Sequence, residues 1–437
     1  MKIILSVQLL CLFTFSITGG QQLETAKQAF LYFQEAEQIA RQDNGKLWGQ
    51  SLAGPMLFVD PHTRVVFANQ ADSAGHLKKL GEVYTAVLPK QFNMANTVLD
   101  WLGIRWSMIL WPLPEDLYER RQLMMHESFH RIQERLGFPL ANPVNRHLDD
   151  PRGRLWLRLE WEALRNALRA SGDSLIFHLE SALLFRQQRH RLFPEADSLE
   201  TLLEFGEGLA EYTGVTLSGR KEAEIREYLL QRLQQAQTLP SFVRTFAYIS
   251  VPVYGFLLDQ SGFSWRSRLT LQQNISAMIQ QAFGLKRATA PRKMIAERWS
   301  LYGGHRIQEE EEQRAAERKA RIARYRQMFI RQPVIEIPLQ NMNIQFDPRH
   351  IYPLDTLGTV YAASVRISDV WGTLTSTGAV LIRPDWKTAQ IPAAGIDPLS
   401  QKASITGNGW TLEINTGWKL VRETGDNRYR LIPHSGR

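Results

Sequence analysis

The segment PEDLYERRQLMMHESFHRIQERLGFP, residues 114–139, decides both the fold and the chemistry of this chain. Apolar side chains recur in it at helical spacing, and a glycine and a proline follow as a stop. It therefore predicts a helix over residues 114–136, with a proline and two acids in the first turn. His126 and His130 are four positions apart, so both imidazoles lie on one face of this helix.

The run His126-Glu127-Ser128-Phe129-His130 is the H-E-x-x-H pattern, in which two histidines on one helical face bind a metal ion. Zinc makes a bound water acidic enough to lose a proton near neutral pH, and a carboxylate beside the ligands can take that proton. The pattern predicts His126 and His130 as zinc ligands and Glu127 as the general base. Two incidental histidines on a buried helix are the simpler alternative.

A catalytic zinc ion needs a third protein ligand. The extended motif with a third histidine fails, because Gln133 and Leu136 occupy its glycine and histidine positions. The best candidate is Glu207, whose flanking glycines cost about 1 kcal/mol each in a helix interior and are easiest to explain by a close backbone approach. Glu211 follows one turn later and can accept the outer N–H of a ligand histidine. Other acids remain as alternative ligands: Glu204, Glu211, Glu160 and Glu162, the last two with surface salt bridging as the simplest role.

These residues resemble the gluzincin metallopeptidases, a group that includes thermolysin-like enzymes and zinc aminopeptidases. The resemblance rests on the H-E-x-x-H motif and on the run from Glu207 to Glu211, and it covers mainly residues 95–260. It implies a zincin-like fold with one zinc ion held by His126, His130 and Glu207, with Glu127 as the base and Glu211 supporting the site. The chain departs from the group in the long gap between His130 and Glu207, and it lacks the Gly-x-Met-Glu-Asn motif of the aminopeptidase branch.

Residues 246–259 are similar to the tyrosine-bearing helix of the same group. The resemblance makes Tyr248 the first candidate, and Tyr254 the second, for the donor to a developing oxyanion. A core tyrosine with a satisfied hydroxyl is the simpler role for each. Residues 97–102 and 104–111 read as strands. In gluzincins an edge strand before the zinc helix pairs with substrate, so residues 104–111 are expected to bind a peptide backbone by strand addition, or else to form an ordinary sheet strand.

The order of the elements predicts an α+β fold. A small N-terminal sheet precedes the zinc helix, and residues 151–284 read as helices with breaks at Gly172, Pro194, Gly219, Pro240 and Gly262. Short β-like runs after Pro333 predict an all-β sandwich or small barrel. The expected domains are a signal peptide at 1–20, the zincin-like metallopeptidase domain at 21–304, a charged helical connector at 305–332 and an all-β accessory domain at 333–437.

Composition and the N-terminus suggest the compartment and the partners. The chain has 437 residues and a formal net charge of +8, with the basic residues spread along the predicted helices. It contains no nucleic-acid-binding motif. The positive charge therefore favours an acidic envelope or membrane surface as a partner. Residues 1–20 have the pattern of a secretory signal peptide, with an apolar first helix as the alternative. The single cysteine, Cys11, lies inside that segment, so the mature chain is expected to be secreted or periplasmic and free of disulfides.

The sequence thus predicts an exported, zinc-dependent metallopeptidase that hydrolyses peptide or protein substrates by Glu-activated zinc-bound water, within chains rather than from their ends. Two alternatives stay open: a zinc hydrolase of a non-peptide bond, and a non-catalytic envelope-binding protein that acts through its β domain. No cofactor other than zinc is expected. Substrate preference and oligomeric state do not follow from the sequence.

Overall fold

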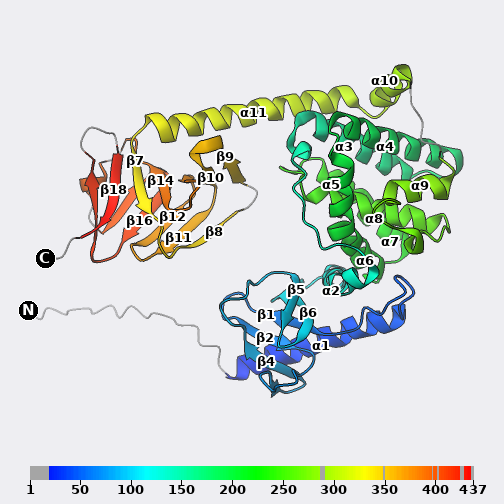
Figure 1. Ribbon diagram of the computed structural model, residues 1–437, viewed down its shortest axis with the longest axis horizontal. Coiled ribbons are helices and arrows are strands. Elements are labelled where there is room, and N and C mark those ends of the chain that lie inside the picture. Colours follow the sequence, from blue (N-terminus) through cyan, green and yellow to red (C-terminus); the bar gives the residue numbers. More distant parts are fainter. Residues whose placement is uncertain are drawn as a thin grey trace, which may run out of the picture. The chain divides into compact units, whose positions relative to one another are not determined.

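The computed structural model describes residues 19–285, 291–347, 350–395, 397–400, 403–423 and 428–434. The predicted signal peptide, with Cys11, lies outside the described residues, apart from the first residues of helix α1 (Gly19–Asp43). The chain divides into two compact units, Met1–His305 and Arg306–Arg437 (Figure 1). No helix within the described ranges combines the length and the apolar character that crossing a membrane requires.

The first unit contains a small N-terminal sheet followed by helices, and the second contains β-sheets, so the expected α+β fold is confirmed. The N-terminal sheet has six strands in the order β3-β4-β2-β1-β6-β5. Its strands are β1 (Met56–Val59), β2 (Val65–Ala68), β3 (Lys78–Leu80), β4 (Val83–Val87), β5 (Thr97–Trp101) and β6 (Ile104–Leu110). β1 pairs in parallel with β6, and the other neighbours are antiparallel.

The position of β6 corrects one expectation. Residues 104–111 were expected to form the edge strand that pairs with substrate, but β6 is hydrogen-bonded on one side to β1 and on the other to β5. Its backbone groups are therefore already paired, and strand addition cannot occur there. The edge of the sheet on this side is β5, the strand that precedes β6 in the sequence.

The motif helix is α2 (Leu117–Gln133), which begins later than the sequence predicts. Asp116 is its N-cap, since this carboxylate accepts hydrogen bonds from the backbone N–H groups of Tyr118 and Glu119, each at 2.9 Å. A short 3-10 turn, η1 (Glu134–Leu136), follows, and Gly137 closes it with a φ of 80°. α2 packs between β6 and the later helix α6 (Figure 1).

The rest of the first unit is helical, with each predicted break confirmed. Its α-helices are α3 (Pro151–Ala167), α4 (Gly172–Leu192), α5 (Ala196–Leu203), α6 (Leu209–Leu217), α7 (Glu222–Ala236), α8 (Thr245–Gln260), α9 (Ile275–Phe283) and α10 (Arg292–Leu301). Gly172 begins α4 with a φ of 55°, and the other four glycine or proline positions fall between helices. These five positions therefore mark helix boundaries in this part of the chain, whereas Pro252 lies inside α8.

Helix α11 (Gly304–Arg331), of which all but the first two residues belong to the second unit, leads into two sheets. The seven-stranded sheet has the order β17-β18-β7-β14-β13-β10-β9 and the five-stranded sheet the order β15-β16-β12-β11-β8. The strands are β7 (Val334–Pro338), β8 (Asn343–Phe346), β9 (Ile351–Pro353), β10 (Thr359–Ala362), β11 (Val365–Asp369), β12 (Gly372–Ser376), β13 (Ala379–Ile382), β14 (Thr388–Pro392), β15 (Ser404–Gly407), β16 (Trp410–Ile414), β17 (Trp418–Arg422) and β18 (Arg428–Pro433). Side chains of both sheets share one core, as in a sandwich, and Tyr325 and Phe329 of α11 pack on the seven-stranded sheet.

Candidate metal centre

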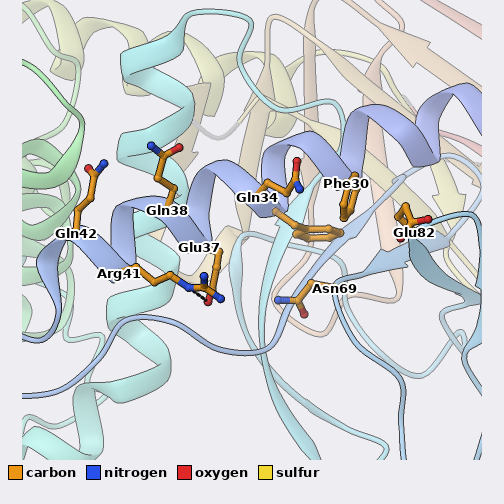
Figure 2. Close-up of a pocket in the computed structure, with 9 residues that line it drawn as sticks. Phe30, Gln34, Glu37, Gln38, Arg41, Gln42, Asn69 and Glu82 are labelled. Carbon is orange, nitrogen blue, oxygen red and sulfur yellow. Dashed lines mark hydrogen bonds and ion pairs between the residues drawn. The ribbon is translucent and has the colours of Figure 1, made fainter.

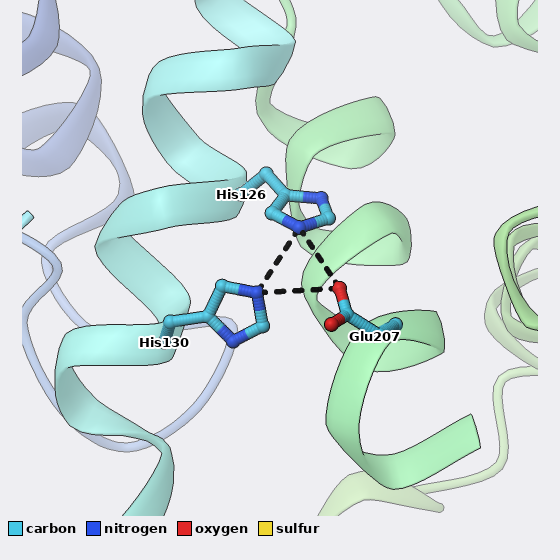
Figure 3. A group of neighbouring side chains, drawn as sticks. All are labelled: His126, His130 and Glu207. Atoms are coloured by element: carbon cyan, nitrogen blue, oxygen red, sulfur yellow. Dashed lines mark hydrogen bonds and ion pairs between the residues drawn. The ribbon is translucent and has the colours of Figure 1, made fainter. Parts of the chain in front are cut away.

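Three side chains from two helical segments converge on one point (Figure 3). The Nε2 atoms of His126 and His130 on α2 are 3.1 Å apart, and Oε2 of Glu207 lies 3.7 Å and 3.6 Å from them. Two donors that each lie about 2.0–2.1 Å from a tetrahedral zinc ion are about 3.3 Å apart. The three separations fall on either side of that value, so the residues fit a zinc ion.

The proton on His126 is located by Glu211 of α6. The Nδ1 atom of His126 is 3.0 Å from Oε2 of Glu211, and an ionised carboxylate can only accept a hydrogen bond. The Nδ1 atom is therefore the protonated nitrogen, and the lone pair of Nε2 is directed to the convergence point. Gln122 donates to the other carboxylate oxygen of Glu211 at 2.8 Å, which fixes the orientation of that carboxylate.

The proton on His130 is located by a residue that the sequence did not single out for this role, Gln133. The Nε2 group of Gln133 donates to the carbonyl oxygens of Pro139 at 2.8 Å and Phe205 at 3.4 Å, so its Oε1 atom is the one that faces Nδ1 of His130, at 2.9 Å. His130 therefore donates from Nδ1 and also presents the lone pair of Nε2. The only sequence signal for this role is the i,i+3 spacing on α2.

Two histidine nitrogens and a carboxylate that converge on one point are a donor set that suits a divalent cation. Burial lowers the pKa of His126, but the neighbouring carboxylates of Glu207 and Glu211 outweigh burial and raise that pKa to about 10. Burial raises the pKa of Glu207, but the neighbouring His126 and His130 and the hydrogen bond from Tyr248 more than offset it, and the pKa falls far below its ordinary range. The metal-free site thus holds a proton beside a carboxylate, at the place where a divalent ion fits.

The segment that carries Glu207 departs from α-helical geometry. Between α5 and α6 the backbone forms a π turn, η3 (Glu204–Gly208), a feature that is frequent at functional sites. A Cβ atom on Gly206 would lie 2.8 Å from the carbonyl oxygen of Ala141, and one on Gly208 would lie 2.4 Å from Cγ2 of Val251. The flanking glycines therefore allow the close approach that the sequence analysis expected.

The other acids considered as third ligands are held elsewhere. Arg186 lies 2.9 Å from Glu160 and 2.8 Å from Glu204, in a fully buried ion-pair network that Arg189 extends to Glu200. Glu162 forms a salt bridge with Arg165 at 2.6 Å, as its helical spacing allows. The expected surface position is wrong for Glu160, which is fully buried in the network. The described part of the chain therefore brings Glu207, and not these acids, to the two histidines.

Glu127 is buried in the wall of the same cavity. It is 3% exposed, and its Oε2 atom has no hydrogen-bond partner among the residues that the structure describes. Burial raises the pKa of this carboxyl group above its usual value. An unpartnered carboxylate oxygen in the wall of a cavity calls for an explanation, and a base that acts on a molecule in the cavity is one.

The two candidate tyrosines differ in their surroundings. The ring of Tyr248, on α8, stacks on His126 with centroids 5.8 Å apart, and its hydroxyl donates to Glu207. Burial and the adjacent Glu207 raise the pKa of this phenol, so it stays a donor. Tyr254 is fully buried and donates to Glu160 at 2.9 Å, which is the core role. Tyr254 is therefore outside the site, and Tyr248 is inside it.

The cavity around the triad has a volume of about 770 Å³. The edge strand β5 forms part of its wall through Thr97 and Val98, and residues 140–142 and Gly206 form another part. Three further residues line the cavity: Tyr228 and Arg232 of α7, and Arg244, which immediately precedes α8. No motif marks them, because they reach the cavity only through the packing of helices.

A second cavity, of about 590 Å³, lies along α1 and is lined by fewer residues that could bind a metal or react with a substrate (Figure 2). Its polar lining consists mainly of amide side chains with one ion pair, between Arg41 and Glu37 at 2.7 Å. It contains no histidine or cysteine, and its two acids, Glu37 and Glu82, are not part of a metal-binding group among the described residues.

No protein-family model matches the chain, and no curated protein or solved structure matches it. The functional conclusion therefore rests on the residues of the cavity around His126, His130 and Glu207.

Proposed function

We propose that the chain is a zinc-dependent metallopeptidase of the gluzincin type, which hydrolyses bonds within peptide or protein substrates. The observation that carries the proposal is the convergence of His126, His130 and Glu207, whose ligand-type atoms all lie within 4.8 Å of one another. Glu211 and Gln133 support it, because they hold the Nδ1 protons and leave both Nε2 atoms as ligands.

A zinc ion held by these three residues supplies a Lewis acid that polarises a carbonyl group and lowers the pKa of water. Glu127 takes the proton that the attacking water loses. Its raised pKa, caused by burial, brings the carboxylate closer to the neutral range in which a general base is effective. The same carboxyl group can then give the proton to the departing amine.

Tyr248 stabilises the charge that develops on the substrate oxygen. Its phenol remains protonated because burial and Glu207 raise its pKa, and its hydroxyl lies at the ligand carboxylate. A protein donor aimed at a developing oxyanion is worth about 10²–10³-fold in turnover. Tyr248 is thus the residue of this cavity best suited to that role.

The edge strand supports peptides as the substrate class. Among the described residues β5 has no strand partner on its outer side, and Thr97 and Val98 line the cavity, so an extended chain can add to the sheet beside the triad. This kind of binding recognises the backbone and not the ends of a peptide, which favours cleavage within chains. In this proposal β5, and not the strand at residues 104–111, pairs with the substrate backbone.

The proposal is tested with the full chain and a library of denatured casein fragments. We expect internal cleavage that stops when a chelator removes zinc and returns when one equivalent of zinc is added. Mass spectrometry of the products distinguishes internal from terminal cleavage. A zinc-loaded, folded chain that leaves every fragment intact would contradict the peptidase function.

A further inference from the structure

The cavity extends beyond His126 toward the start of α2, where Arg232 lines it, and a second arginine, Arg244, lines it beside Glu207. Gln122 lies one turn before His126 on α2, and Tyr228 and Arg232 come from α7. Arg244 immediately precedes α8. All of them line the same cavity as the ligand triad, so a molecule that reaches the triad can also contact both guanidinium groups.

Both arginines are only partly engaged by the protein. The side chain of Arg232 is 36% exposed and lies 3.9 Å from Oε1 of Glu211, an oxygen that already accepts a hydrogen bond from Gln122. The side chain of Arg244 is 46% exposed and donates from one nitrogen to Oε1 of Glu207 at 3.1 Å. A guanidinium group carries five N–H donors, so each arginine keeps donors for a further acceptor.

The third arginine of the cavity, unlike the other two, is paired with two carboxylates. Arg105, beside the opposite end of α2, lies 3.2 Å from Asp100 and 2.6 Å from Glu134, so two carboxylates offset its charge. Arg232 and Arg244 instead share acids that are also bound to His126 through their other oxygens. Each of these two arginines therefore keeps N–H donors for a substrate, although its charge is shared with one acid.

The charges at this end also permit an anion. The carboxylates of Glu207 and Glu211 are matched by the two arginines, and a divalent ion adds two positive charges against the carboxylate of Glu127. Even when the exposed Glu119 is counted, this end carries no net negative charge that would repel a carboxylate. Two guanidinium groups in one cavity supply the donors that the two oxygens of such a group accept.

We propose that Arg232 and Arg244 together bind a carboxylate group of the substrate and so make the enzyme selective for peptides that carry one near the scissile bond. The inference rests on the proposed peptidase function and adds a substrate class to it. The carboxylate can be an Asp or Glu side chain, which agrees with cleavage within chains, or a peptide C-terminus, which would place the scissile bond near the chain end and would overturn internal cleavage while leaving the peptidase chemistry. The two sources are separated by experiment.

The test measures binding, with the full zinc-loaded chain carrying Glu127→Gln so that no peptide is consumed. Fluorescently labelled peptides of one sequence are compared as free acid against C-terminal amide, and with internal Glu against internal Gln. We expect a free carboxylate to tighten binding about tenfold or more, and the pair that differs identifies its source. Arg232→Gln and Arg244→Gln should each remove most of the difference, while the Lys variants should retain part of it.

Arg41→Gln is the matched control, since Arg41 is 77% exposed on α1 and away from this cavity, and it should leave the preference intact. Thermal unfolding confirms that all variants are folded. Equal binding of all four peptides by a chain that cleaves casein would overturn this inference and leave the peptidase function standing. The inference also fails if the preference persists in both glutamine variants. A wild-type chain that binds zinc and cleaves none of the peptides would instead remove the proposed function on which the inference rests.

Discussion

Gln133 accepts a hydrogen bond from His130 at 2.9 Å while its own amide N–H group is held by two backbone carbonyls. This relationship fixes the tautomer of a candidate ligand through a fully buried side chain. Gln133 stands where a longer zinc motif would carry glycine. In this chain the position therefore supports the second histidine instead of turning the backbone toward a third.

Replacing Gln133 by Met should weaken zinc binding by about 10–100-fold, because His130 loses the acceptor that holds its Nδ1 proton. The carbonyl groups of Pro139 and Phe205 also lose a donor, so the free energy of unfolding should fall by about 1–3 kcal/mol. Competition with a chromogenic chelator and chemical denaturation measure the two effects. The control is Gln390→Met in the second unit, where an equally buried amide bonds Glu336, and it should lower stability without changing zinc affinity. Equal zinc affinities in both variants would remove Gln133 from the site.

Glu127→Gln should keep zinc and lose turnover. The amide has nearly the same shape as the carboxylate but cannot take a proton, so kcat should fall by about 10²–10⁴-fold. Glu37→Gln, the same change at an exposed acid of α1, is the control and should behave as wild type. Initial rates on a quenched fluorescent peptide, with zinc content measured on the same samples, check the prediction. Unchanged turnover in Glu127→Gln would show that the base is another group.

Gly208→Ala should displace the π turn that carries Glu207. The new Cβ atom would lie 2.4 Å from Cγ2 of Val251 and 3.1 Å from the carbonyl oxygen of Ala247, so α8 and η3 must separate. We expect a loss of about 1–3 kcal/mol in stability together with weaker zinc binding. Gly378→Ala is the control, because a Cβ atom there meets its nearest neighbour at 3.5 Å, which is ordinary contact. A Gly208→Ala variant with wild-type zinc affinity would mean that the glycine is not needed for the position of Glu207.

Zinc affinity should rise with pH. Burial lowers the pKa of His126, but Glu207 and Glu211 raise it to about 10 in the metal-free site, so zinc must displace a proton at any lower pH. The apparent association constant should therefore increase by up to about tenfold per pH unit between pH 6 and 8. For the metal-free chain the sign is opposite: the stabilisation from protonated His126 is complete below the unfolded pKa of 6.5 and is lost as the pH rises toward 10. A zinc affinity that is constant over this range would contradict a protonated metal-free site.

Helix breaks, the motif helix and the α+β order of elements could be predicted because they depend on local sequence. Pro194 and Gly262 lie just after helix ends and Gly172 begins a helix, each through its own backbone properties, and the apolar spacing around His126 is visible within a few turns. The pairing of strands could not be predicted in the same way. β6 is an inner strand only because β1, from far upstream, pairs with it in parallel.

In the sandwich, too, the sequence does not show which strands belong to the same sheet. Residues 360–367 read as one strand, but the chain bends at Ala363, which has a φ of 69°, and passes from β10 in one sheet to β11 in the other. No glycine marks this bend. In the candidate site, the motif indicated His126, Glu127 and His130, whereas Arg232, Arg244 and the role of Gln133 depend on contacts between segments far apart in the sequence.

Zinc content of the purified full chain, measured with and without Glu207→Ala, tests the central claim most directly. The control variant is Glu162→Ala, an acid paired with Arg165 and separate from the triad. We predict one zinc ion per chain in the wild type and in the control, and loss of stoichiometric zinc in Glu207→Ala. A folded Glu207→Ala chain that retains one tightly bound zinc ion, or a wild-type chain that binds none, would contradict the account.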